Sequence, residues 1–248
     1  MRVTDRVHLI GSGEPDLLTT DPLDSQVYLV RTADEFVVVD SGAGRSVERI
    51  LANVIADGCD PARLSWLFLT HAHADHAGGG AAWKAALPGI RIAVSAEAAS
   101  WLARGDEEAT SVDVARAAGI YPADFRLRPF DADRHLADGD RIELEPDLVL
   151  TVVATPGHAA GHLSFVLDDG PHRTLFSGDA VFPGGRILLQ DTWDCDLGAT
   201  LRSVERLAGL GSVDLLAGHL PPAIGEAALH LQLAVDRIAG LNPPPNLT

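Results

Sequence analysis

The sequence predicts a mixed α/β fold in which two β-sheets pack face to face and helices cover their outer faces. Short apolar runs typical of buried strands recur along the whole chain and are interspersed with segments of amphipathic helical spacing. The two halves of the chain repeat this alternation. An arrangement with the strands inside and the helices outside buries the apolar faces of both the sheets and the helices. No shift in composition forces a boundary, so we expect residues 1–248 to form one domain.

The first half is expected to begin with strands and continue into a helix. The helix is predicted over residues 46–56, where apolar side chains such as Val47, Ile50 and Val54 recur at helical spacing, and Gly58 is a suitable stop. A shorter helix is expected near residues 81–87. The predicted strands cover residues 7–10, 27–31, 36–40, 66–69 and 90–94.

The second half is expected to contain further strands and two long helices. The strands are predicted near residues 141–144, 148–155, 163–167, 174–177 and 213–216, and the helices near 197–207 and 224–241. The prolines at 243–245 cannot continue the last helix.

Two segments look like additions to this scaffold. Residues 96–130 show helical spacing at Val112, Ala115 and Ala118, which predicts a small helical cap inserted into the domain. Residues 180–196 form a long loop in the second half. We expect both segments to border the functional site, because loops carry specificity while sheets carry stability.

The most informative feature is the stretch Thr70–His76, which contains His71, His73, Asp75 and His76 directly after an apolar run. Neutral imidazole nitrogens and carboxylate oxygens are good ligands for divalent metals. Four such ligands at the mouth of one strand exceed the needs of a single open site. The spacing therefore suggests two metals.

Three later strand ends supply further ligands of the same kind. His158, Asp179 and His219 each stand beside a glycine at the end of a predicted buried strand. Glycine lets the backbone turn sharply and brings the neighbouring side chain to the sheet edge. The four strand ends are therefore expected to form one site at one edge of a sheet.

Together with Asp40, which ends the run Val37–Asp40, these motifs resemble those of the metallo-β-lactamase superfamily, in the order found in that family. The resemblance implies a four-layer αββα sandwich. It also implies a dinuclear enzyme of the glyoxalase II or lactonase-like branch. The ligands it implies are His71, His73 and His158 for one metal, Asp75, His76 and His219 for the second, and Asp179 as a bridge between both.

Two further residues are expected to support the ligands. By the same resemblance, Asp40 lies behind the ligands, where it would orient an imidazole through its other ring nitrogen. His162 follows His158 by four positions, and because the first ligand set is already complete, it is expected to make a supporting hydrogen bond.

The expected activity is metal-dependent hydrolysis of a carbonyl ester, thioester or lactone. A hydroxide shared by two divalent cations could attack the carbonyl carbon, with one metal polarising the carbonyl oxygen. By the same resemblance, Asp75 would hand a proton to the leaving group, and Asp179 would hold both metals at the reacting centre. Zn²⁺ is the default ion for these ligands, although iron and manganese also suit them.

Departures from named subfamilies narrow the expected function. True β-lactamases of the superfamily lack a bridging aspartate at the position of Asp179, so antibiotic hydrolysis is disfavoured. Homoserine lactonases carry a tyrosine where this chain has Phe182. The expected substrate contacts are Phe182, Arg186 and Trp193, of which Arg186 suits an anionic group. Two alternatives stay open: a mononuclear-iron persulfide dioxygenase of the same superfamily, and a non-enzymatic metal-binding protein.

Composition bears on partners and location. A net charge of −16 and the lack of a basic run argue against nucleic acid, which needs clustered cations. No apolar run is long enough to cross a bilayer, and the first residues lack the apolar core of a signal peptide. We therefore expect a cytoplasmic protein with a small-molecule substrate and no membrane partner. The cap and the apolar C-terminal helix would suit a homodimer.

Overall fold

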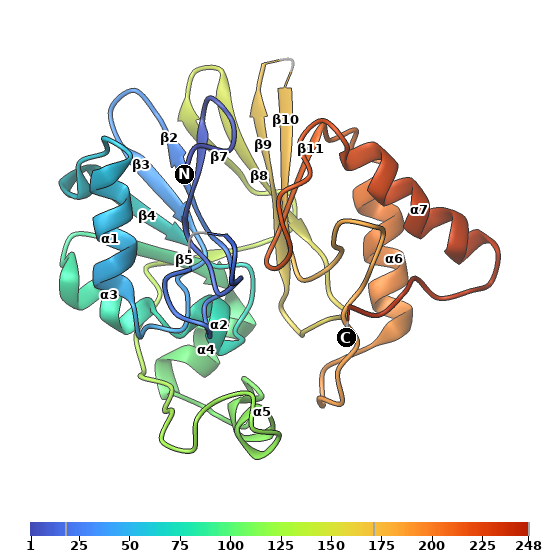
Figure 1. Cartoon of the computed structure of the whole chain (residues 1–248), viewed down its shortest axis with the longest axis horizontal. Coiled ribbons are helices and arrows are strands. Elements are labelled where there is room, and N and C mark those ends of the chain that lie inside the picture. Colours follow the sequence, from blue (N-terminus) through green and yellow to red (C-terminus); the bar gives the residue numbers. More distant parts are fainter. Residues whose placement is uncertain (18, 171, 248) are drawn as a thin grey trace. The chain divides into compact units, whose positions relative to one another are not determined.

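The computed structural model describes residues 1–17, 19–170 and 172–247, and it divides into two compact units, Met1–His135 and Leu136–Thr248. Each unit is described by itself below (Figure 1). The expectation that both act as one domain stays a prediction. In the described residues, no helix is long and apolar enough to cross a membrane.

The first unit is built on a six-stranded sheet with the order β1-β2-β3-β4-β5-β6. The first three strands are antiparallel neighbours, whereas β3, β4 and β5 run parallel. Parallel strands end at the same edge of a sheet, which matters for the site below. The strands are β1 (Val7–Gly11), β2 (Val27–Arg31), β3 (Phe36–Val39), β4 (Leu64–Phe68), β5 (Arg91–Ser95) and β6 (Arg134–Leu136).

Helices cover one face of this sheet and complete its core. Helix α1 (Val47–Ala56) buries Val47, Ile50 and Val54 against the strands, as its spacing predicted. In Figure 1, α1 and α3 (Gly80–Ala86) lie on the same side of the sheet. The remaining helices of the unit are η1 (Pro61–Arg63), α2 (Ala74–Ala77), α4 (Ala96–Arg104) and α5 (Val112–Ala117).

The second unit is built on a five-stranded sheet with the order β11-β10-β9-β8-β7. Its strands β7 to β10 are antiparallel neighbours, and β11 runs parallel to β10. Helices α6 (Leu197–Ala208) and α7 (Ala227–Ala239) pack side by side on one face (Figure 1). The strands are β7 (Arg141–Glu145), β8 (Leu148–Ala154), β9 (Leu163–Asp169), β10 (His172–Gly178) and β11 (Asp214–Ala217).

The expected strands and long helices are present, with shifts of a few residues at their ends. Two differences have clear causes. Helix α4 begins directly after β5, because the Ser95 hydroxyl accepts a hydrogen bond from the Ala98 N–H and caps it. Helix α7 begins at Ala227 rather than near Ile224, because Ala223 pairs with Leu215 and Gly225 donates its N–H to Asp214. The spacing of apolar residues alone does not distinguish helix from loop at the starts of α4 and α7.

Candidate metal centre

Strand direction explains why the candidate ligands gather at sheet edges. In the first unit, Asp40 follows β3 and His71 follows β4, and these strands are parallel. In the second unit, His158 follows β8, Asp179 follows β10 and His219 follows β11, and all three strands point the same way. The expectation of one edge of one sheet was wrong in one respect. The ligand-bearing ends belong to two sheets, one in each unit.

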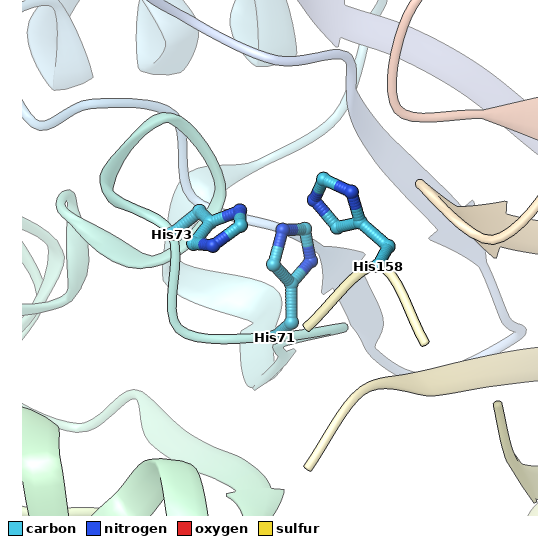
Figure 2. A group of neighbouring side chains, drawn as sticks. All are labelled: His71, His73 and His158. Atoms are coloured by element: carbon cyan, nitrogen blue, oxygen red, sulfur yellow. The ribbon is translucent and has the colours of Figure 1, made fainter. Parts of the chain in front are cut away.

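His71 and His73 stand together on the loop after β4. Their rings meet edge to face, with centroids 4.7 Å apart and planes at 77° (Figure 2). His71 is fully buried and its Nδ1 lies 3.0 Å from the Thr70 hydroxyl. The turn is short because Ala74–Ala77 begins a helix at once, with His73 as its N-cap residue.

Asp40 organises this loop from behind. Its carboxylate accepts the Thr70 N–H at 2.8 Å and the Thr70 hydroxyl at 3.0 Å, and it lies 2.8 Å from Nδ1 of His76. Because a carboxylate only accepts, His76 Nδ1 carries the proton. The Thr70 hydroxyl donates its only proton to Asp40, and it therefore accepts a hydrogen bond from Nδ1 of His71. Asp40 thus sets the tautomer of both histidines so that each Nε2 faces away from it.

The backbone of Asp40 supports the same reading. Asp40 is buried and adopts a φ of 62°, a left-handed conformation that costs energy in residues other than glycine. Such strain persists only where the surrounding contacts hold it, and it clusters at functional sites.

Asp75 and His76 form the second pair of this loop. Asp75 Oδ2 lies 3.4 Å from Nε2 of His76, which is long for a hydrogen bond and suits two ligands of one metal. The other oxygen of Asp75 accepts a hydrogen bond from the hydroxyl of Tyr121 at 3.0 Å. Nothing in the sequence local to residue 121 indicates a contact with residue 75.

In the second unit, Asp179 lies between two histidines. Its Oδ2 is 3.6 Å from Nε2 of His158 and 3.5 Å from Nε2 of His219. His158 Nδ1 is 3.2 Å from the Leu188 carbonyl, which can only accept, so Nε2 is again the nitrogen directed at the carboxylate. Asp179 and His158 are buried, and the His219 side chain is about a quarter exposed at 25%. Figure 2 shows the His158 ring on a loop segment, and this loop follows β8.

His162 engages both ring nitrogens within the second unit. Its Nε2 accepts the backbone N–H of Asp179 at 3.1 Å, so its Nδ1 carries the proton and donates to the Thr155 hydroxyl at 2.8 Å. Thr155 in turn contacts the hydroxyl of Ser164 at 2.9 Å. With its nitrogens occupied in this way, His162 holds the loop that carries Asp179. Its supporting role in catalysis stays a prediction.

The donor set fits divalent metals. Nδ1 protons on His71, His76 and His158 leave Nε2 as the ligand atom, which is the usual arrangement at protein metal sites. Two ligands bound at about 2.1 Å with a tetrahedral angle are roughly 3.4 Å apart, close to the 3.4–3.6 Å found inside each unit. The candidate ligands in the described residues are His71, His73, Asp75, His76, His158, Asp179 and His219.

Glycines allow the close packing behind these loops. A Cβ on Gly79 would stand 2.4 Å from the Ser41 carbonyl oxygen, and the Gly79 N–H donates to the Ser41 hydroxyl at 3.0 Å. In the second unit, Gly157 has a φ of 139° and a Cβ there would stand 2.2 Å from the Thr200 nitrogen. No larger residue fits at either position without moving backbone.

The environment also shifts two pKa values near the first-unit loop. Burial raises the pKa of the Tyr28 phenol well above its ordinary value, and the neighbouring Asp40 charge adds to the shift. Burial likewise raises the pKa of Asp24, against hydrogen bonds from Ser46, Thr20 and the Ala43 N–H that favour its charged form. Tyr28 therefore stays protonated at neutral pH.

The three expected substrate contacts have different surroundings. Phe182 is fully buried beside Leu188 and Ala217, and its ring centroid lies 6.3 Å from that of His219. Arg186 is exposed and pairs with Phe182 across a tight turn. Trp193 is 61% exposed. These positions leave substrate contact by each residue as a prediction. Both cysteines, Cys59 and Cys195, are free thiols.

Comparison with known families identifies the superfamily of the chain. The chain belongs to the metallo-β-lactamase superfamily: the family model "Metallo-beta-lactamase superfamily" matches residues 20–219, which include all seven candidate ligands. The predicted family is therefore confirmed, and membership supports the prediction of a metal-dependent hydrolase.

Curated relatives extend the comparison. The chain is 36% identical to the acyl-coenzyme A thioesterase MBLAC2 of Homo sapiens over 177 residues, which is 66% of this chain and 60% of that protein. It is 27% identical to the lactamase-like protein aptB of Emericella nidulans, over 95% of this chain and 65% of that protein. This chain thus spans less than two thirds of the length of these relatives.

Solved structures confirm the fold class. The FEZ-1 metallo-β-lactamase of Legionella gormanii aligns with a TM-score of 0.70 at 21% identity, covering 97% of this chain and 94% of that one. At that identity the likeness speaks for the fold. It agrees with the predicted αββα class, with two mixed sheets that each carry helices.

Proposed function

We propose that this protein is a dinuclear metal-dependent hydrolase that cleaves acyl thioesters. In this proposal the candidate ligands of the two units act together, as parts of the single family domain that spans residues 20–219. One metal is held by His71, His73 and His158, the second by Asp75, His76 and His219, and Asp179 is shared by both.

The observation that carries the proposal is the position of Asp179. A single carboxylate oxygen, Oδ2, is nearly equidistant from Nε2 of His158 and Nε2 of His219. Each of these distances is that of two ligands on one metal, which would let the same oxygen serve one metal beside His158 and another beside His219. A pair of divalent ions would lower the pKa of a water towards 7 and polarise a substrate carbonyl.

The residues around the centre have separate tasks. Asp40 keeps His71 and His76 in the tautomer that offers Nε2, and His162 fixes the backbone that presents Asp179. We assign Asp75 to carry a proton to the leaving group, because its side chain is 20% exposed whereas that of the neighbouring His76 is fully buried. A thiolate leaving group needs less of this help than an alkoxide, because thiols are more acidic.

A thioester is the first choice among the three acyl bonds. The relatives at 36% identity carry the name acyl-coenzyme A thioesterase. Phe182 stands where homoserine lactonases have a tyrosine, and its side chain carries no hydroxyl to assist ring opening. Zn²⁺ is the metal we propose, because imidazole and carboxylate ligands suit it.

Metal quantification followed by a substrate panel tests the proposal. We expect two zinc ions per chain and faster turnover of acyl thioesters than of lactones or aryl esters. One iron per chain with oxygen consumption on a persulfide would instead identify the dioxygenase alternative. Two metals with no turnover of any acyl substrate would favour the non-enzymatic alternative.

A pair of variants separates the shared ligand from general damage. Asp179→Asn is expected to lower metal content from two to one or less and to reduce kcat by at least about a hundredfold. Asp214→Asn is the matched control, because Asp214 is another buried aspartate of the same unit, bonded to His172 and Gly225. It should cost stability and leave two metals bound. Full metal content in Asp179→Asn would refute the shared role.

A further inference from the structure

Tyr121 connects the cap segment to a candidate metal ligand. It lies just after helix α5 and is 7% exposed. Its hydroxyl accepts the backbone N–H of Asp75 at 3.1 Å and contacts Asp75 Oδ1 at 3.0 Å. Forty-six positions of sequence separate the two residues, so the contact belongs to the tertiary fold.

The direction of both hydrogen bonds follows from chemistry. An amide N–H can only donate, so the phenol oxygen accepts there, and the phenol proton is left for the carboxylate. One residue therefore clamps both the main chain and the side chain of Asp75. A hydrogen bond to a charged carboxylate is among the stronger kinds.

The phenol is held rigidly from behind. The Tyr121 ring stacks on Phe125, with centroids 4.7 Å apart and planes at 23°. Arg116 donates to the Phe125 carbonyl at 2.9 Å and pairs with Glu107 at 2.8 Å. Phe125 is itself buried in the core of the first unit. These contacts fix where the hydroxyl points.

The contact with Tyr121 leaves the two oxygens of the Asp75 carboxylate with different partners. Oδ1 faces the phenol and Oδ2 lies 3.4 Å from Nε2 of His76. We propose that Tyr121 is a positioning residue that holds Asp75 as a ligand through one oxygen only, and so sets the affinity of the metal shared by Asp75 and His76. This inference rests on the proposed dinuclear centre and assigns the cap a part in building it.

The same geometry links cap order to metal binding. If the phenol must be in place for Asp75 to bind well, anything that loosens residues 112–125 weakens the second metal. By linkage, the second metal must stabilise the cap to the same extent. A cap that merely packed over the core would show no such reciprocity.

The test is Tyr121→Phe, which removes one oxygen and keeps the ring that stacks on Phe125. Metal-free protein is titrated with Zn²⁺ against a chelating indicator, and with Co²⁺ while its visible spectrum is recorded. We expect the first equivalent to bind as in the wild type. The second should bind about ten- to a hundredfold more weakly, the usual loss when a hydrogen-bond partner of a ligand is removed, and its Co²⁺ bands should change.

Phe125→Leu is the control for packing. It removes the stacking and keeps the phenol oxygen, so it should lower the melting temperature and weaken binding of the second equivalent, but by less than Tyr121→Phe does. The double variant Asp75→Asn with Tyr121→Phe should bind the second metal no worse than Asp75→Asn alone, because the phenol acts through Asp75.

The outcomes distinguish this inference from the proposal beneath it. Wild-type affinity for the second metal in Tyr121→Phe overturns the positioning role and leaves the dinuclear centre standing. Additive losses in the double variant overturn it as well. A wild-type protein that binds only one equivalent overturns the dinuclear centre and this inference together.

Discussion

At the scale of single residues, hydrogen-bond direction decides which atoms face the metals. The chain that runs from His71 through Thr70 to Asp40, and from Asp40 to His76, has one consistent order of protons. It commits each Nδ1 and frees Nε2 for coordination. Asp40 adopts an unfavourable positive φ, and this conformation places its carboxylate against three donors, the Thr70 N–H, the Thr70 hydroxyl and Nδ1 of His76.

Asp40→Asn tests this ordering. The amide is nearly isosteric and can still accept from His76, but it lacks the negative charge that stabilises the Nδ1 proton. We expect the second Zn²⁺ to bind about tenfold more weakly or worse in a competition titration. The melting temperature of the metal-free variant serves as the folding control. Unchanged affinity for both ions would show that Asp40 serves the fold alone.

The residue types of the site were predictable from sequence, and their partners were not. Three histidines within six residues announce metal chemistry wherever they occur, because little else requires them. Tyr121 shows the limit. A tyrosine in a cap has many uses, and only the fold reveals that its hydroxyl meets Asp75. Phe182 shows it again, since a residue near the ligands turned out to be fully buried.

At the scale of elements, periodicity predicted α1 well and α4 poorly. Helix α1 alternates buried and exposed positions at a spacing that only a helix produces. Helix α4 follows β5 without a connecting loop, and a capping serine at the end of a strand gives little warning of the change. Boundaries of this kind depend on local hydrogen bonds that hydrophobic pattern does not encode.

The turn between β3 and α1 depends on a buried carboxylate. Asp24 accepts hydrogen bonds from the Ala43 N–H at 2.8 Å and from the hydroxyls of Ser46 and Thr20 at 2.5 Å each. Burial raises its pKa above the ordinary value of 3.8, while these hydrogen bonds act in the opposite direction. The folded protein therefore holds a proton on Asp24 more tightly than the unfolded chain does.

The sign of the resulting pH dependence follows from linkage. A raised pKa means that the stability contributed by protonated Asp24 is fully present below the unfolded value of 3.8 and is lost as pH rises through the folded value. Asp24→Asn cannot ionise. In urea unfolding of metal-free protein, the stability advantage of the wild type over this variant should be larger at about pH 4 than at pH 7. A larger advantage at pH 7 would contradict it.

At the scale of the whole molecule, the net charge bears on which class of substrate the protein can bind. The chain carries 35 acidic residues against 19 basic ones, a net charge of −16. We infer a small-molecule substrate rather than a nucleic acid on that ground. The predicted homodimer stays a prediction, and helix α7 exposes Leu229 and Leu233 on the side away from its buried residues.

The same charge gives the thioesterase proposal a measurable consequence. Coenzyme A thioesters carry several phosphate charges, and a protein of net charge −16 repels them at long range. Salt screens that repulsion, since the Debye length falls from about 30 Å at 0.01 M to about 8 Å at 0.15 M. We expect kcat/KM for an acyl-CoA to rise roughly twofold or more over this range. For an uncharged thioester of the same acyl group, kcat/KM should change little with salt, because that substrate carries no charge for the protein to repel.

The uncharged thioester is also the control for direct effects of salt on the enzyme. If both substrates gain equally, salt acts on the protein and not on the encounter. If kcat/KM for the acyl-CoA falls with salt instead, a local group of cations must attract the phosphates strongly enough to outweigh the net charge. Exposed Arg186 is the first residue to replace in that case, because a guanidinium binds phosphate through two donors. Arg186→Ala should then remove the salt dependence while leaving the uncharged thioester unaffected.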